Sequence, residues 1–155
     1  MRFRAEALPG RRASRHRPAA IAWSSLALSW TLLVWVLLTA PQTPESQLVD
    51  ALLPALLRPW QDKLAHLMLF LVQTLLVERA ASARRRPAST RDRWHALLLA
   101  IGCSLALGAA TELRQRTIPS RDADPLDFAA DAAGAATWAG TLALSRRYAR
   151  ARAPA

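Results

Sequence analysis

Apolar residues run along the chain in long blocks that short polar segments separate. No charged residue occurs in the 27 positions of residues 18–44, and residues 21–40 are almost wholly apolar. A helix of about 20 apolar residues crosses the ~30 Å hydrocarbon core of a bilayer, because each residue adds about 1.5 Å. The first block therefore predicts a membrane-spanning helix at residues 20–40. It exceeds the apolar region of a signal peptide, about 7 to 15 residues, so we expect it to be retained.

Three later blocks complete the pattern. They predict helices at about residues 61–79, 94–113 and 127–145. The middle block holds 18 consecutive uncharged residues, which is nearly long enough to span alone. The block before it holds only 14, so it spans by placing its polar ends in the interface. The sequence thus predicts an all-α fold, a four-transmembrane-helix bundle that occupies residues 20–145.

The last block differs from the others in composition. It contains Asp131 and is dominated by Ala and Gly, so it suits contact with other helices better than contact with lipid. Ala130 with Gly134, and Ala136 with Gly140, follow the small-xxx-small spacing that lets two helices approach closely. We therefore expect this helix to pack tightly inside the bundle.

The basic residues indicate how the bundle is oriented. Sixteen of the 21 Lys and Arg residues lie in segments 1–19, 78–93 and 146–155, whereas the opposite side holds five, with eight of the 11 acids. Segments rich in Lys and Arg remain in the cytoplasm, so both termini are predicted there, as basic tails at residues 1–19 and 146–155. The net charge of +10 then favours anionic membrane lipids, not nucleic acid, as the partner. This predicts a multi-pass protein of the cytoplasmic (inner) membrane.

Ionisable residues of the predicted helices concentrate at their outer ends. Residues three or four positions apart share a helix face. The pairs with this spacing are Asp62 with His66, Glu112 with Gln115, and Asp127 with Asp131. Charges at membrane depth cost several kcal/mol unless they are paired or hydrated, so these side chains should face the bundle interior. Asp131 lies past the first turn of its helix, where it caps nothing, and is a functional-site candidate.

Two kinds of role are expected at this polar site. The candidate catalytic residues are His66, Glu112, Asp127 and Asp131. The candidates for substrate binding are Asp62, Lys63, Gln115 and Arg121. Structural alternatives remain open: Asp62 and Asp127 suit a helix N-terminus, and Glu112 and Arg121 could form an ion pair. Metal ligands and cofactors are not expected, because no spacing such as His-x-x-x-His occurs.

The same residues resemble a known family motif. The elements present, in order, are Asp62-Lys63, His66, Phe70, Glu112, Gln115, Arg121, Asp127, Asp131 and Gly134-Ala135. They resemble the VanZ-like family of small bacterial membrane proteins over about half of the chain. One position departs from the family, which usually has Asn where this chain has Asp131. The resemblance implies a polytopic envelope protein linked to resistance to the glycopeptide teicoplanin, without a settled biochemical activity.

Three functions are compatible with the sequence. In the first, the outer site binds or acts on an anionic lipid or a lipid-linked cell-wall precursor: Lys63 and Arg121 hold the anion, and His66 with a carboxylate supplies acid–base chemistry. In the second, the carboxylates and His66 form a proton relay or part of a small transporter. In the third, the polar residues are the packing network of a non-catalytic membrane scaffold.

Overall fold

The computed structural model describes residues 17–41, 60–85, 89–121 and 123–152, and their regular secondary structure is entirely helical. The helices are α2 (Arg17–Thr39), α4 (Gln61–Arg85), α5 (Thr90–Gln115) and α6 (Pro125–Ala151). The predicted all-α fold is therefore confirmed for this part of the chain. Most of the predicted first tail, residues 1–16, lies outside the described residues.

Local sequence signals set where two of these helices begin. Ser89 caps α5: its side chain accepts a hydrogen bond from the backbone of Asp92, whose carboxylate accepts one from the backbone of Ser89. Asp124 caps α6 and Pro125 follows at the first helical position, where a missing N–H costs nothing. Both starts are thus encoded within a few residues, independently of the rest of the fold.

The helices extend beyond the uncharged blocks that predicted them. α4 continues from the predicted end at residue 79 to Arg85, and α5 begins at Thr90 instead of residue 94. α6 begins two residues earlier than predicted and ends at Ala151 instead of residue 145. The added segments at the ends of α4 and α6 are rich in Ala and Arg, which are strong helix formers. An uncharged block marks the part of a helix that suits lipid, whereas propensity and capping decide where the helix ends.

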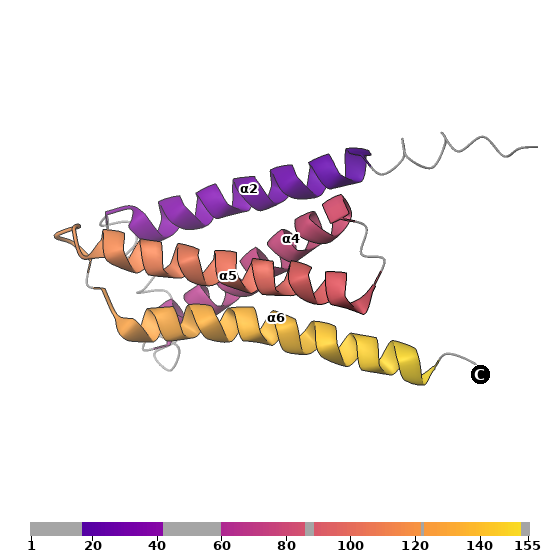
Figure 1. Cartoon of the computed structure of the whole chain (residues 1–155). Coiled ribbons are helices and arrows are strands. Elements are labelled where there is room, and N and C mark those ends of the chain that lie inside the picture. The colour runs from indigo at the N-terminus through magenta and orange to yellow at the C-terminus, as the bar shows by residue number, and fades with distance from the viewer. Residues whose placement is uncertain (1–16, 42–59, 86–88, 122, 153–155) are drawn as a thin grey trace, which may run out of the picture.

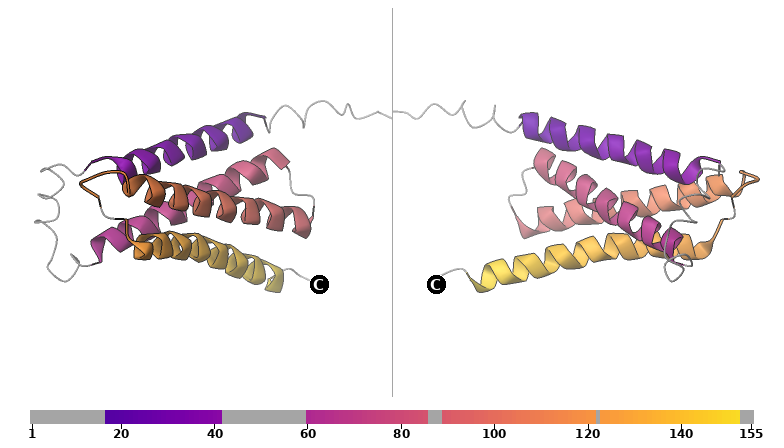
Figure 2. Two further views of the ribbon diagram at one scale, coloured as in Figure 1. Left: turned by 60° about the vertical axis from the view of Figure 1, so that its left-hand side comes forward. Right: turned by 180° about the vertical axis from the view of Figure 1, so that it is seen from behind.

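The four helices lie side by side, with α4 crossing behind α5 (Figure 1). α4 contacts each of the other three helices, and its contact with α6 is the most extensive. α2 and α6 lie on opposite sides of the α4–α5 pair, as the further views also show (Figure 2). The start of α2 and the end of α6 lie at one end of the bundle, together with the end of α4 and the start of α5.

Burial in this bundle differs from that in a water-soluble protein. Many large apolar side chains are exposed on the outside, whereas the interior holds polar residues beside apolar ones. The buried polar residues are His66, Gln73, Thr74, Glu78, Ser104, Thr111, Glu112, Gln115, Asp127 and Asp131. An apolar exterior is stable only in an apolar solvent or against a partner. Three described helices, α2, α4 and α5, are long and apolar enough to cross a membrane, so the fold is that of a membrane protein.

A glycine allows α4 and α6 to approach each other closely. A Cβ added at Gly134 would overlap the backbone oxygen of Leu67 and would lie 2.9 Å from the backbone nitrogen of Leu71. The expected close contact at Gly134 is therefore present. The second small pair makes no such contact, because Ala136 and Gly140 are exposed and an added Cβ at Gly140 meets nothing within 4 Å.

Gly134→Ala should destabilise the bundle, because the neighbouring atoms are backbone and only a separation of the helices can relieve the overlap. Overpacking of this kind costs about 1–3 kcal/mol. We expect a lower melting temperature for the detergent-purified variant by differential scanning fluorimetry. Gly140→Ala is the matched control and should melt at or above the wild-type temperature; equal losses in both variants would contradict the close contact.

Candidate functional site

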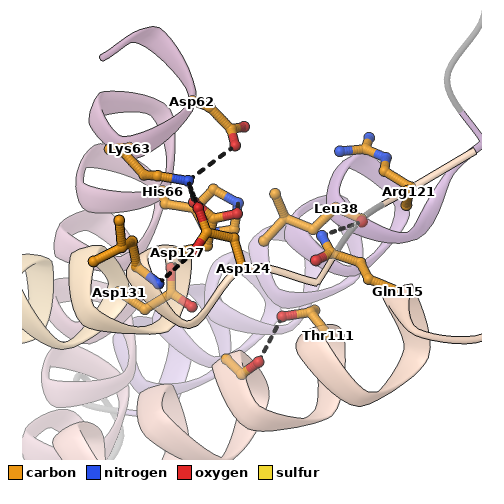
Figure 3. Close-up of polar contacts among 12 residues, drawn as sticks. Leu38, Asp62, Lys63, His66, Thr111, Gln115, Arg121, Asp124, Asp127 and Asp131 are labelled. Atoms are coloured by element: carbon orange, nitrogen blue, oxygen red, sulfur yellow. Dashed lines mark hydrogen bonds and ion pairs between the residues drawn. The ribbon is translucent and has the colours of Figure 1, made fainter. Parts of the chain in front are cut away.

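One end of the bundle gathers six ionisable side chains from two helices and the loop before α6 (Figure 3). α4 contributes three of them, one turn or less apart, and α6 with its N-cap contributes the others. We call this group the polar cluster: Asp62, Lys63, His66, Asp124, Asp127 and Asp131. Five of its members were predicted from sequence. Parallel packing of α4 and α6 brings them together, because both helices begin at this end.

The buried centre of the cluster is a pair formed by His66 and Asp131. The Nδ1 atom of His66 lies 2.8 Å from Oδ1 of Asp131, and the two side chains are 1% and 0% exposed. A carboxylate accepts hydrogen bonds, so Nδ1–H donates, and in the neutral ring the electron pair is then on Nε2. Nε2 is buried without a hydrogen-bond partner and lies 4.0 Å from Oδ2 of Asp127. Asp131 therefore orients a basic nitrogen toward the rest of the cluster.

A second glycine makes room for this pair. A Cβ added at Gly108 of α5 would lie 2.6 Å from Oδ2 of Asp131. Any larger residue at Gly108 would push against the carboxylate that holds His66. The same oxygen of Asp131 is buried without a hydrogen-bond partner, so α5 contributes space and not a polar contact.

Lys63 lies among three carboxylates. Its Nζ atom lies 2.6 Å from Asp124 and 3.6 Å from Asp62, and it also forms an ion pair with Asp127. The ammonium of Lys63, with the backbone N–H of Leu126, lowers the pKa of Asp124 below its usual value. Lys63 was expected to bind an anionic substrate, but its charge is already satisfied by acids of this chain.

Gln115 and Arg121 tie the end of α5 to α2. The amide Nε2 of Gln115 donates to the carbonyl of Leu38 at 2.9 Å. The guanidinium of Arg121 donates to the carbonyls of Leu37 and Ala40 at 3.1 and 3.2 Å. These carbonyls at the end of α2 are therefore the partners of the Arg121 guanidinium. The alternative of an ion pair between Glu112 and Arg121 is wrong.

These residues also line a pocket of about 250 Å³ at the same end of the bundle. Its lining residues are Asp62, Lys63, Gln115, Ser120, Arg121, Asp124 and Asp127. All four predicted substrate-binding residues are thus in one pocket. His66 lies behind it, next to Asp127, whose side chain is 5% exposed.

Glu112 occupies a separate position, between the polar cluster and a groove on the bundle surface. Its side chain is buried, its Oε1 atom has no hydrogen-bond partner, and it lies within electrostatic range of Asp127, His66 and Asp131. The groove has a volume of about 340 Å³ between α5 and α6. Its lining is mostly apolar and consists of Ala109, Glu112, Leu113, Arg116, Pro125 and Phe128. Glu112 is therefore the one predicted site residue that faces this groove.

Sequence reasoning missed two residues of the site, Asp124 and Arg116. The Asp-Pro dipeptide at the start of α6 indicates only that Asp124 caps the helix. Its ion pair with Lys63 joins residues 61 positions apart, so local sequence does not reveal it. Arg116 follows Glu112 by four positions on the α5 side of the groove, which is the spacing of an i, i+4 pair. That spacing could have identified it.

Three of the predicted site residues also have side-chain atoms that lie close together. Asp62, His66 and Asp127 each offer an atom, and these atoms lie within 4.8 Å of one another. The absence of a close ligand spacing in the sequence argued against a metal, but these residues come from two helices, so linear spacing could not reveal the group.

Comparison with known proteins identifies no relative. A scan against protein-family models finds no match, and searches of the curated proteins and of the solved structures find none. Inferences about function therefore depend on the geometry of the polar cluster and on the motif resemblance.

Asp131→Ala should destabilise the protein more than any change at the exposed edge of the cluster. It leaves Nδ1 of His66 buried without an acceptor, and breaking a buried pair in this way costs about 3 kcal/mol. Asp131→Asn should cost less than half as much, because its amide oxygen can still accept the hydrogen bond. Thermal melts in detergent measure both changes.

The matched control is Asp62→Asn, whose side chain is 56% exposed. Removal of an exposed ion pair costs roughly 0–1 kcal/mol, so this variant should melt near the wild-type temperature. A melt of Asp131→Ala that matched that of Asp62→Asn would show that the buried pair does not form.

Proposed function

We propose that this chain is a VanZ-like, multi-pass protein of the bacterial cytoplasmic membrane, with four spans and both termini in the cytoplasm. The apolar exterior and polar interior of the bundle support insertion in lipid. Only 17% of the most apolar window of α2 is buried, so most of its surface needs an apolar surrounding. The end of the bundle opposite the polar cluster carries the arginines of α4 and α6 and those at the start of α5, which agrees with the positive-inside rule.

The fourth span is α6. Its 27 residues extend about 40 Å, more than the ~30 Å of hydrocarbon, although it lacks a continuous window as apolar as those of the other three helices. It lies alongside α4 over an extensive contact, so α4 shields part of its surface from lipid. A helix that is shielded by neighbouring helices needs less apolar surface than a helix that faces lipid on all sides.

Reporter fusions test this topology. Green fluorescent protein fused after Ala155 should fluoresce, because it folds in the cytoplasm, and alkaline phosphatase at the same point should be inactive. Alkaline phosphatase fused after Thr39, at the end of α2, should be active. The reverse activities would place the polar cluster on the cytoplasmic side.

The polar cluster is the functional site of this proposal, and it acts on the polar headgroup of an envelope lipid or a lipid-linked cell-wall precursor. The observation that carries this is Nε2 of His66, an oriented and unpaired basic nitrogen beside a pocket. An unsatisfied buried polar group costs about 1–3 kcal/mol, so a ligand that engages Nε2 would recover this free energy. Enzymes orient a catalytic imidazole with a carboxylate in the same way.

The apolar groove supports a lipid as the ligand. Leu113 and Phe128 line it and suit an acyl chain, and Arg116 at its rim can hold an anionic group. Glu112 faces this groove and also lies within electrostatic range of His66. A ligand with its chain in the groove would thus have its polar end next to the cluster, with Arg116 in the anion-binding role first expected of Lys63.

The resemblance supplies a test in cells. Expression of the chain in a teicoplanin-susceptible bacterium should raise the minimum inhibitory concentration of teicoplanin, and His66→Ala and Glu112→Gln should remove the increase. Both substitutions remove acid–base groups from the site. Profiles of lipids and of lipid-linked precursors in the same strains would identify the molecule that changes.

Glu78→Gln is the control, because Glu78 is also a buried acid of α4 but lies toward the other end of the helix. Immunoblots of membrane fractions must show equal amounts of each variant. Full protection by both His66→Ala and Glu112→Gln would disprove a role for the cluster, and no protection by the wild type would disprove the link to teicoplanin.

A further inference from the structure

The polar cluster contains more negative than positive charge. Four carboxylates, those of Asp62, Asp124, Asp127 and Asp131, meet the single ammonium of Lys63, so the formal charge is −3 with His66 neutral. Charges near the hydrocarbon of a membrane are costly unless they are paired. Such a site attracts a further cation and repels an anionic headgroup unless that cation is present.

Three side chains of the cluster are placed as a ligand set. Ligand atoms of Asp62, His66 and Asp127 lie within 4.8 Å of one another, and Nε2 of His66 lies 4.0 Å from Oδ2 of Asp127. Around Zn²⁺, with bonds of about 2.0–2.2 Å, tetrahedral ligands lie roughly 3.3 Å apart. Side-chain shifts of about an ångström would therefore close the set around an ion.

An independent observation marks His66 as the nitrogen ligand. Nε2 is fully buried, unpaired and directed at the two carboxylates, while Nδ1 is engaged by Asp131. Histidine ligands of metals almost always donate their other ring N–H to a carboxylate or carbonyl in this manner, which fixes the tautomer. Of the two acids of α6, Asp127 thus faces Nε2 and Asp131 holds the ring through Nδ1.

Lys63 is compatible with an ion at this point. It pairs with Oδ1 of Asp127 and with Asp124, whereas the oxygen of Asp127 nearest His66 is Oδ2. Asp127 can therefore bind Lys63 through one oxygen and a cation through the other. Lys63 would then offset part of the excess negative charge without occupying the position between Nε2 and the carboxylates.

We infer that Asp62, His66 and Asp127 bind a divalent transition-metal ion, of the class of Zn²⁺ or Mn²⁺, at the polar pocket. One nitrogen and two carboxylate ligands suit these ions better than Ca²⁺ or Mg²⁺, which prefer oxygen alone. Three protein ligands leave a coordination position for water or for an oxygen of a phosphate. This inference rests on the proposed function and deepens it, because the ion would let an acidic site hold an anionic headgroup and would occupy Nε2 of His66.

Metal binding to the purified full-length chain tests the inference directly. The chain is stripped with EDTA in detergent, dialysed against Zn²⁺ or Mn²⁺ separately, and analysed by mass spectrometry for metal content and by calorimetry for affinity. Wild type should retain about one ion per chain. Asp62→Asn and Asp127→Asn should each weaken binding about tenfold or more, and Asp131→Asn about 10- to 100-fold through the orientation of His66.

Glu78→Gln is again the control and should bind with wild-type affinity, because it is distant from the ligands along α4. Asp62 is largely exposed, so Asp62→Asn keeps the test valid even if changes at the buried acids unfold the chain. Absence of bound metal in wild type, or binding unaltered by Asp62→Asn and Asp127→Asn, would overturn the inference. Loss of protection in His66→Ala without any metal binding would leave the proposed function standing, with Nε2 as a proton acceptor.

Discussion

Ionisable groups inside an apolar bundle must find partners, and the contact between His66 and Asp131 meets this requirement where α4 and α6 pack. The pair is wholly buried, so its hydrogen bond is not weakened by water. Its formation needs two helix backbones close together, which Gly134 permits, and space on a third helix, which Gly108 supplies. Sequence features that look unrelated, two glycines and two ionisable residues, are thus parts of a single arrangement.

This arrangement determines what the pocket end of the bundle can do. Because Asp131 fixes the ring of His66, Nε2 is held toward Asp62 and Asp127 instead of rotating among partners. The excess of acids there favours a cation, and the apolar groove beside Glu112 favours a chain of hydrocarbon. The proposed ligand, a lipid with an anionic headgroup held through a metal ion, satisfies both preferences.

Most of the site could be predicted from sequence because charge is rare in membrane segments and every such residue is informative. What the sequence left open concerns partners. Arg121 binds the carbonyls of Leu37 and Ala40 instead of Glu112, Lys63 pairs with Asp124, and Asp131, at the position where the VanZ-like motif usually has Asn, pairs with His66. Helical spacing shows which residues share a face, but it does not show which face of another helix they meet.

The sequence by itself determined the helical class, the apolar segments and the positions of the ionisable residues near the ends of these segments, because these follow from local composition. Tertiary structure alone decided that α6 packs on α4 through Gly134, that Asp131 is the partner of His66, and that three ligand atoms converge. The reason is physical. Helix formation depends on neighbours three or four residues away, whereas these contacts join residues more than 60 positions apart and depend on how closely two backbones approach.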